Sequence, residues 1–201
     1  MSISKLRRTP SKAKRDNGVA TCALPPTVSR TALLDKGSDR RFRTLVNDLL
    51  TIASRMEIVR AHLGRRMRIS GPQYSVLVAV AHLQAERGVS VGAVAQAMHV
   101  SSAFIASESG KMARLGLLLK RANPQDRRSV LLSLAPAGRL KIDRVSAEIQ
   151  AINDLFFGGL DASSFAALSA TAGVLVKGSA KAVHYVNAVE REPLSALNAT
   201  G

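Results

Sequence analysis

The chain has 201 residues and a mass of 21.3 kDa. That length allows one ordinary domain with an added arm, because single hydrophobic cores saturate at roughly 100–200 residues. Lys and Arg number 29 against 14 Asp and Glu, for a net charge of +15, while 46% of the residues are hydrophobic. We therefore expect a folded protein that faces a polyanion, such as nucleic acid or an anionic membrane surface. With Cys22 as its one cysteine, an internal disulfide and a cysteine-built metal site are excluded.

No targeting or membrane segment is apparent. The longest uncharged stretch, residues 88–107, carries several serines, Gln96 and His99, which hydrocarbon would not tolerate unpaired. Basic residues break up the N-terminus, so it lacks the apolar centre of a secretory signal, and it shows no arginine-studded amphipathic helix of the transit-peptide kind. We expect no membrane partner and a cytoplasmic, nucleoid-associated protein.

Residues 1–37 are predicted to form a disordered basic arm, because their prolines, glycines and scattered charges cannot bury enough apolar surface. Residues 1–43 hold 11 basic and 3 acidic side chains, about half of the net charge. Two interpretations of this arm stay open: a segment that tracks phosphates, or a solubilising tail. Residues 191–201 are predicted to be a flexible C-terminal tail.

Helical periodicity begins at Asp39, where apolar residues recur at steps of three or four and predict one long helix. This stripe consists of Phe42, Leu45, Leu49, Ile52, Met56, Val59, Leu63 and Met67. Ser70 predicts the cap of a second helix that ends at Gly88. The residues of that helix expected to face inward are Tyr74, Leu77, Val80 and Leu83.

The next elements are shorter. A third helix is expected after Ser90, and a fourth from Ser101 or Ser102 until Gly116 stops it. Residues 117–121 and 129–134 predict two strands around a turn-prone, charged tip at 123–128. Pro136 opens a fifth helix, and Gly158-Gly159 separates it from a last helix over residues 161–189.

A short helix, a tight turn, a second helix and a β-hairpin form the order of a winged helix-turn-helix, whose second helix enters the major groove. Two ordinary core helices would explain the apolar Val94 and Ala95 but not the basic hairpin that follows. At the start of the second helix, Ser101, Ser102 and Ala103 are small enough to approach phosphates or base edges.

Residues 89–138 resemble the core of the MarR family of dimeric winged-helix transcription regulators, most specifically in the run NPQDRRSVLLSLAPAG. The resemblance implies a mainly α fold, a winged helix-turn-helix with a small β-hairpin wing and a helical dimerisation region from both termini. It places this domain at residues 38–190, with the DNA-binding part at about 71–138. Double-stranded DNA with a near-palindromic operator, and a second copy of the chain, are the implied partners.

In the hairpin, the resemblance implies that Arg128 reaches the minor groove and that Asp126 steadies the wing through charge pairing. A guanidinium suits the negative potential of a narrow groove. Arg127, Arg121 and Lys120 are expected to face phosphates, with an ordinary solvated run of charges as the alternative.

In the recognition helix, the sequence departs from the family pattern at Phe104, Ser107 and Glu108. Phe104 is expected either to contact a thymine methyl group or sugar, or to pack inside the protein. We expect Ser107 and Lys111 to bind DNA. Glu108 lies on the inward side by helix spacing, and we expect it to pair with Lys111 or with a partner's arginine.

Members of the family often bind small aromatic acids or phenols between the dimer helices and the winged domain. Arg60 or His62 is a candidate partner for a carboxylate, and Tyr74 or Met56 for a ring. The alternative for each is an ordinary surface or core residue.

Enzymatic motifs are missing: the four histidines show no metal-ligand spacing, and neither a phosphate-binding loop nor a GxSxG elbow occurs. We expect no enzyme, no cofactor and no metal. The resemblance implies a sequence-specific transcription regulator, expected to be a homodimeric repressor relieved by a small-molecule effector. A nucleoid-type architectural protein that binds DNA without sequence preference is the alternative, and a helical adaptor for an acidic protein is a third.

Overall fold

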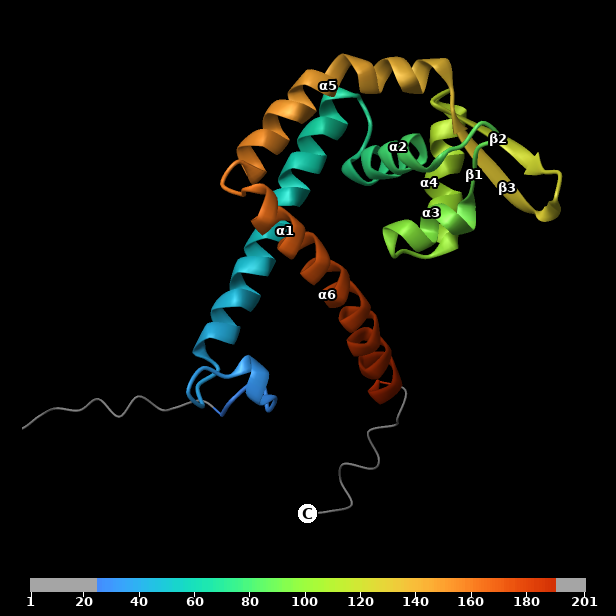
Figure 1. The fold of residues 1–201 in the computed structure, drawn as a ribbon. Coiled ribbons are helices and arrows are strands. Elements are labelled where there is room, and N and C mark those ends of the chain that lie inside the picture. Colours follow the sequence, from blue (N-terminus) through green and yellow to red (C-terminus); the bar gives the residue numbers. More distant parts are fainter. Residues whose placement is uncertain (1–24, 191–201) are drawn as a thin grey trace, which may run out of the picture. The chain divides into compact units, whose positions relative to one another are not determined.

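The computed structural model describes residues 25–190. The chain divides into two compact units, residues 1–53 and 54–201, and the helix α1 (Arg40–Arg66) contributes to both. The predicted winged helix-turn-helix architecture is confirmed, with six α-helices and a three-stranded sheet in the described part (Figure 1). Cys22 and the C-terminal tail lie outside the described residues.

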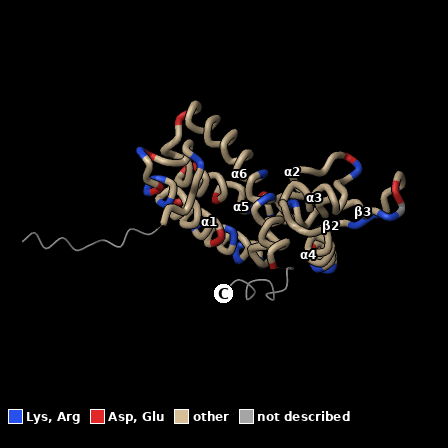
Figure 2. The backbone as a smooth tube through the Cα atoms, turned by 90° about the horizontal axis from the view of Figure 1, so that it is seen from below, with Lys and Arg blue, Asp and Glu red and all other residues tan. Residues whose placement is uncertain are grey.

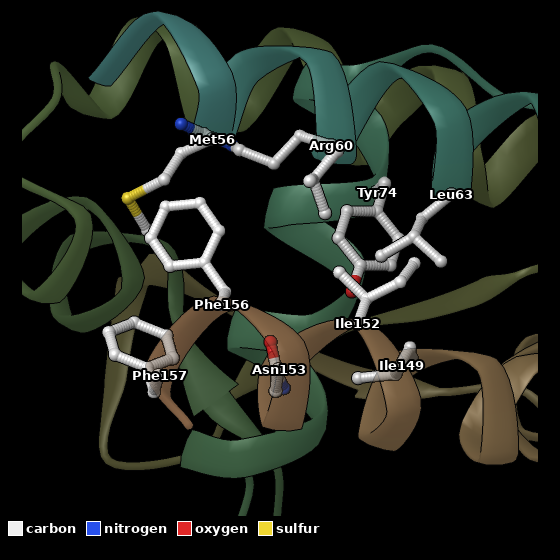
Figure 3. A pocket seen from close by; sticks show the side chains of 10 residues that line it. Met56, Arg60, Leu63, Tyr74, Ile149, Ile152, Asn153, Phe156 and Phe157 are labelled. Atoms are coloured by element: carbon white, nitrogen blue, oxygen red, sulfur yellow. The ribbon is translucent and has the colours of Figure 1, made fainter. Parts of the chain in front are cut away.

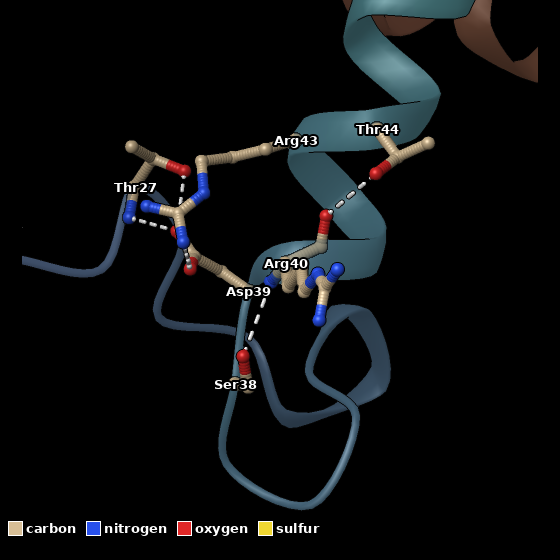
Figure 4. Close-up of polar contacts among 6 residues, drawn as sticks. All are labelled: Thr27, Ser38, Asp39, Arg40, Arg43 and Thr44. Carbon is tan, nitrogen blue, oxygen red and sulfur yellow. Dashed lines mark hydrogen bonds and ion pairs between the residues drawn. The ribbon is translucent and has the colours of Figure 1, made fainter.

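In the first unit, the chain before α1 is tied to the start of that helix. The Asp39 carboxylate accepts hydrogen bonds from the backbone N–H and the hydroxyl of Thr27, at 2.7 and 2.8 Å, and forms an ion pair with Arg43 at 3.1 Å (Figure 4). The bonds from Thr27, with the Arg43 charge, hold the pKa of Asp39 below its usual value. A 3-10 turn, η1 (Thr31–Leu33), lies within this segment.

The prediction of a disordered arm is therefore wrong for residues 25–37, because local hydrogen bonds order this segment without an apolar core of its own. In addition to the Thr27–Asp39 contact, the backbones of Asp35 and Ser38 exchange hydrogen bonds of 2.8 and 2.9 Å. Residues 1–24 of the predicted arm lie outside the described part of the chain.

The helix α2 (Gly71–Leu83) begins where the sequence predicts and ends earlier. Ser70 and Gln73 form a capping box in which each side chain binds the other's backbone N–H. The predicted end at Gly88 is wrong because the chain leaves the helix after Leu83 and closes a turn from Ala85 to Gly88, which has φ of +94°. Leu83 is consequently 41% exposed, not inward-facing as predicted.

The helix-turn-helix consists of α3 (Val91–Met98) and α4 (Ser102–Arg114). Both helices begin where the sequence predicts, and Ser90 and Ser101 cap them through their hydroxyl groups. Between them, His99 takes the left-handed conformation with φ of 54°, which turns the chain within three residues. Both helices pack against α2 and against each other.

The sheet is antiparallel with strand order β1-β3-β2. The hairpin strands β2 (Leu118–Asn123) and β3 (Asp126–Leu134) extend further than predicted, so the turn shrinks to Pro124 and Gln125. The strand β1 (Val89–Ser90) was not predicted, because two residues are too short for an alternating pattern to show.

One hydrophobic core joins α2, α3, α4, the sheet and the facing ends of α1 and α5 (Pro136–Phe157). Its fully buried side chains include Val76, Leu77, Val80, Val94, Ile105, Met112 and Leu132. The Gln84 side chain accepts a hydrogen bond from the backbone N–H of Leu134 at 2.8 Å and so ties the end of α2 to β3. This core holds the helix-turn-helix and the hairpin in one body.

The helix α6 (Ala162–Val189) spans the range that the sequence predicts, is capped by Asp161, and buries none of its residues. Within the described residues, no single helix is long and apolar enough to cross a membrane. Taken together, α5 and α6 have the length and apolar composition of a membrane span, but the chain bends by 93° at the break between them.

Candidate nucleic-acid interface and ligand cavity

The recognition helix α4 presents small and polar residues at its N-terminal end. Ser101, Ser102, Ala103, Ser107 and Lys111 are all exposed. The Ser101 hydroxyl is already engaged, because it accepts the backbone N–H of Phe104 at 3.2 Å. The exposed residues predicted for DNA binding on this helix therefore remain accessible, with Ser101 oriented by its capping bond.

Phe104 and Glu108 occupy the inner side of α4. The Phe104 ring is half-buried and packs against the hydrophobic core. This agrees with packing inside the protein, the second of the two roles expected for Phe104. Glu108 is 8% exposed and its carboxylate pairs with Lys111 at 2.5 Å, which confirms the predicted pairing. One cation predicted to bind DNA is thus partly neutralised within the helix.

The tip of the hairpin contains a β-bulge. Asn123 pairs with Asp126 and Ala122 pairs with Val130, which leaves residues 127–129 without a paired residue on β2. The bulge is held by the Ser129 hydroxyl, which donates to the Asp126 carbonyl at 3.1 Å, while the Asn123 amide donates to the Ser129 hydroxyl at 2.8 Å. Bulges re-aim side chains and occur next to functional sites, and this one contains Arg128.

Asp126 steadies the tip through the backbone. Its carboxylate accepts the N–H of Arg128 at 3.0 Å. The expected charge pairing with Arg128 is wrong: no ion pair of Asp126 occurs among the described side chains, since the carboxylate is turned to the main chain. The Arg128 guanidinium is exposed and free to meet an outside anion.

Positive charge continues from the tip down the hairpin. Lys120 and Arg121 are both exposed on β2, and Figure 2 shows basic positions along the hairpin with an acidic one at its end. Successive side chains of a strand point to opposite faces, so these two cannot face the same stretch of phosphates. Lys120 lies opposite Leu132 in the register. The side chain of Arg127 lies outside what the structure describes.

A small apolar cavity of about 130 Å³ lies between α1, α2 and α5. Three of the four residues predicted for ligand binding line it: Met56, Arg60 and Tyr74. Figure 3 shows the rings of Tyr74, Phe156 and Phe157 around the hollow. Burial raises the pKa of the Tyr74 hydroxyl, so this ring stays neutral at physiological pH.

Arg60 is the cationic group of this cavity and is oriented by two neighbours. Its Nε donates to the Ser75 hydroxyl at 2.8 Å, and its terminal nitrogen pairs with Glu57 at 2.6 Å. Since the Glu57 side chain is 63% exposed, this ion pair is screened by solvent. A carboxylate entering the cavity would therefore find a guanidinium that is positioned but only weakly neutralised.

His62, the fourth predicted ligand residue, does not line the cavity. Its Nε2 lies 2.7 Å from the Glu148 carboxylate, which also accepts a hydrogen bond from Arg66 Nε at 3.0 Å. The bonds from His62 and Arg66 lower the pKa of Glu148. His62 thus joins α1 to α5, and its predicted contact with a ligand is wrong for this cavity.

Half of the residues that line the cavity were not predicted from the sequence. The residues that α5 contributes are Ile149, Ile152, Asn153, Phe156 and Phe157. Their spacing of three and four residues marks one helix face, a signal that could have been read. Tertiary packing, however, determines that this face of α5 lies against α1 and α2. Among the described residues, no group of three or more His, Cys, Asp or Glu could hold a metal ion.

Comparisons with known proteins agree with this architecture. No family model and no curated protein matches the sequence. Among solved structures, the PcaV transcriptional regulator from Streptomyces coelicolor, in complex with its natural ligand, is 27% identical with a TM-score of 0.51; the alignment covers 63% of this chain and 90% of that one.

Two further structures share the fold at lower identity. CouR from Rhodococcus jostii RHA1, bound to p-coumaroyl-CoA, is 22% identical with a TM-score of 0.56, covering 65% of this chain and 90% of that one. A MarR transcriptional regulator from Methanosarcina mazei Go1 is 14% identical with a TM-score of 0.56, covering 69% and 98%. Together with the helix-turn-helix and its bulged hairpin, these likenesses show that this protein has the MarR-type winged-helix fold.

Proposed function

We propose that the protein is a sequence-specific DNA-binding transcription regulator. The observation that carries this proposal is the combination of an exposed N-terminal end of α4 with a bulged hairpin whose Arg128 is exposed, both held on one core. The helix suits the major groove and the arginine suits the minor groove beside it. The net charge of +15 supports encounter with a polyanion.

Competition binding at fixed salt tests this proposal. Duplexes selected from genomic fragments are expected to bind at least roughly 10³-fold more tightly than random duplex. A steep salt dependence without sequence preference would instead favour the nucleoid-type architectural alternative. Binding that survives changes in both α4 and the hairpin would contradict the proposed interface.

The regulator is proposed to act as a homodimer. The helix α6 runs over 28 residues without burying one, and large apolar side chains such as Phe165, Leu168 and Leu175 are exposed on it. On α1, Leu45 and Leu49 of the predicted stripe are also 49% and 40% exposed. Exposed apolar helix surface of this kind favours cover by a second copy, whose symmetry would place two recognition helices one duplex turn apart.

Light scattering is expected to give twice the 21.3 kDa mass of the chain at micromolar concentration. Selected binding sites should then be near-palindromic, because a two-fold protein reads two related half-sites. A monomeric mass would remove the basis for a two-fold operator.

The regulator is further proposed to be a repressor that a small aromatic acid releases from DNA. Supporting this, the cavity of about 130 Å³ combines aromatic walls with Arg60. PcaV in complex with its natural ligand and CouR bound to p-coumaroyl-CoA are ligand-bound proteins of the same fold. In the competition assay, benzoate should release the wild-type protein but not Arg60→Met; equal release of both would contradict this site.

A further inference from the structure

A second hollow, of about 370 Å³, is lined by four basic and two apolar residues. Its lining residues are Arg66, Met67, Arg68, Lys141, Arg144 and Val145. Met67 and Val145 are buried and form an apolar floor, whereas the three arginines are exposed. None of these residues lines the cavity around Arg60. Four basic side chains therefore share one concave site that contains no residue of α4 or of the hairpin.

These cations are poorly neutralised. Glu148 binds Arg66 and divides its carboxylate between that arginine and His62. Among the described residues, no ion pair reaches Arg68, Lys141 or Arg144. Like charges gathered around one hollow repel each other, and an anion placed between them would remove that repulsion.

Lys141 is held in place at the edge of this hollow. Its ammonium donates to the backbone carbonyl of Met67 at 2.6 Å, just beyond the last residue of α1. The C-terminal end of a helix carries partial negative charge, so a cation is favoured there. One wall of the site is therefore ordered before any ligand arrives.

Arg68 occupies a backbone position that favours glycine. It has φ of 56°, and the chain closes around it with a hydrogen bond from the Ile69 N–H to the Gly64 carbonyl at 2.9 Å. This is the left-handed ending of a helix, where glycine is the usual residue because it lacks a Cβ. The backbone therefore gives no reason for an arginine here, while the hollow beside it does.

We propose that this hollow binds phosphate groups. Guanidinium groups bind phosphate oxygens through paired hydrogen bonds, and an ammonium adds a point charge. The phosphate is either that of a free phosphate-bearing compound or that of the DNA backbone. The proposal does not depend on sequence-specific regulation, because its two tests use pyrophosphate and a duplex of mixed sequence.

Calorimetric titration with pyrophosphate tests the first source. Arg68→Gly and Arg144→Gln should each weaken binding roughly tenfold, as expected for one lost charge-assisted hydrogen bond. Arg65→Gln is the matched control, because Arg65 is an exposed cation at the end of α1 that does not line the hollow. Arg68→Gly should not lower the melting temperature, since glycine suits the left-handed position, so its effect is separable from misfolding.

Titration with a mixed-sequence duplex tests the second source. If the site takes the DNA backbone alone, pyrophosphate will not bind measurably. In that case Arg68→Gly and Arg144→Gln should weaken duplex binding more than Arg65→Gln does. The two variants should also reduce the salt dependence of duplex binding, which would assign the hollow to the DNA backbone. If neither ligand distinguishes the two variants from Arg65→Gln, the phosphate site is overturned, whatever the outcome of the sequence-preference assay.

Discussion

Replacing Arg128 by alanine should weaken binding to a selected duplex by about 1–3 kcal/mol, or roughly 5- to 150-fold in the dissociation constant. The guanidinium is exposed at the hairpin tip, and no ion pair engages it among the described side chains. An arginine in a narrow minor groove meets enhanced negative potential. We therefore expect its removal to cost contact with DNA while breaking no ion pair among the described side chains.

The fold should survive this substitution. The bulge depends on Asn123, Ser129 and the Asp126 backbone, and the Asp126 carboxylate binds the main-chain N–H of residue 128, which alanine retains. We expect an unchanged melting temperature. Loss of affinity together with loss of stability would mean that Arg128 supports the hairpin instead of contacting DNA.

Arg139→Ala is the control for net charge. Arg139 is exposed, with 70% of its side chain accessible, and its one ion pair among the described residues is with Asp143 on the same face of α5. Both variants lose one positive charge, so long-range attraction to DNA falls equally in both. Equal affinities of Arg128→Ala and Arg139→Ala for a selected duplex would contradict a specific role for the hairpin tip.

The helix boundaries could be predicted because their signals are local. Ser70, Ser101 and Asp161 each place a side-chain oxygen where the first free N–H groups of a helix need an acceptor. The end of α2 and the two-residue strand β1 could not be predicted in the same way. The strand β1 forms by pairing with β3, and Gln84 at the end of α2 accepts a hydrogen bond from the same strand, so both depend on residues more than forty positions further along the chain.

The parts of the candidate site also differ in whether local sequence signals could predict them. The exposed end of α4 and the charged hairpin are each continuous in sequence, so the resemblance could locate them. The cavity around Arg60 and the contact of His62 with Glu148 join α1 to α5, and helix periodicity alone does not say which faces meet. The role of Asp126 was likewise misjudged, because charge favours a partner arginine while the turn favours a backbone N–H.

The largest loss of stability is expected from Gly138→Ala, in the first turn of α5. An added Cβ would lie 2.2 Å from the Leu117 carbonyl oxygen and 3.1 Å from its carbon, and both belong to backbone. That same carbonyl accepts the Ala135 N–H at 3.0 Å, so the start of α5 and the base of the hairpin cannot separate without losing this bond. Leu117 is also buried, with 2% exposure.

Overpacking against backbone of this kind should cost about 3 kcal/mol or more, which corresponds to a fall of about 6–12 °C in melting temperature for a chain of this size. Gly92→Ala in α3 is the matched control, because a Cβ there meets nothing within 4 Å. Alanine is the better helix former, so this control should hold or slightly raise the melting temperature. Equal melting temperatures of the two variants by circular dichroism would show that α5 does not contact the hairpin base as closely as described, and the hairpin would then lack its support.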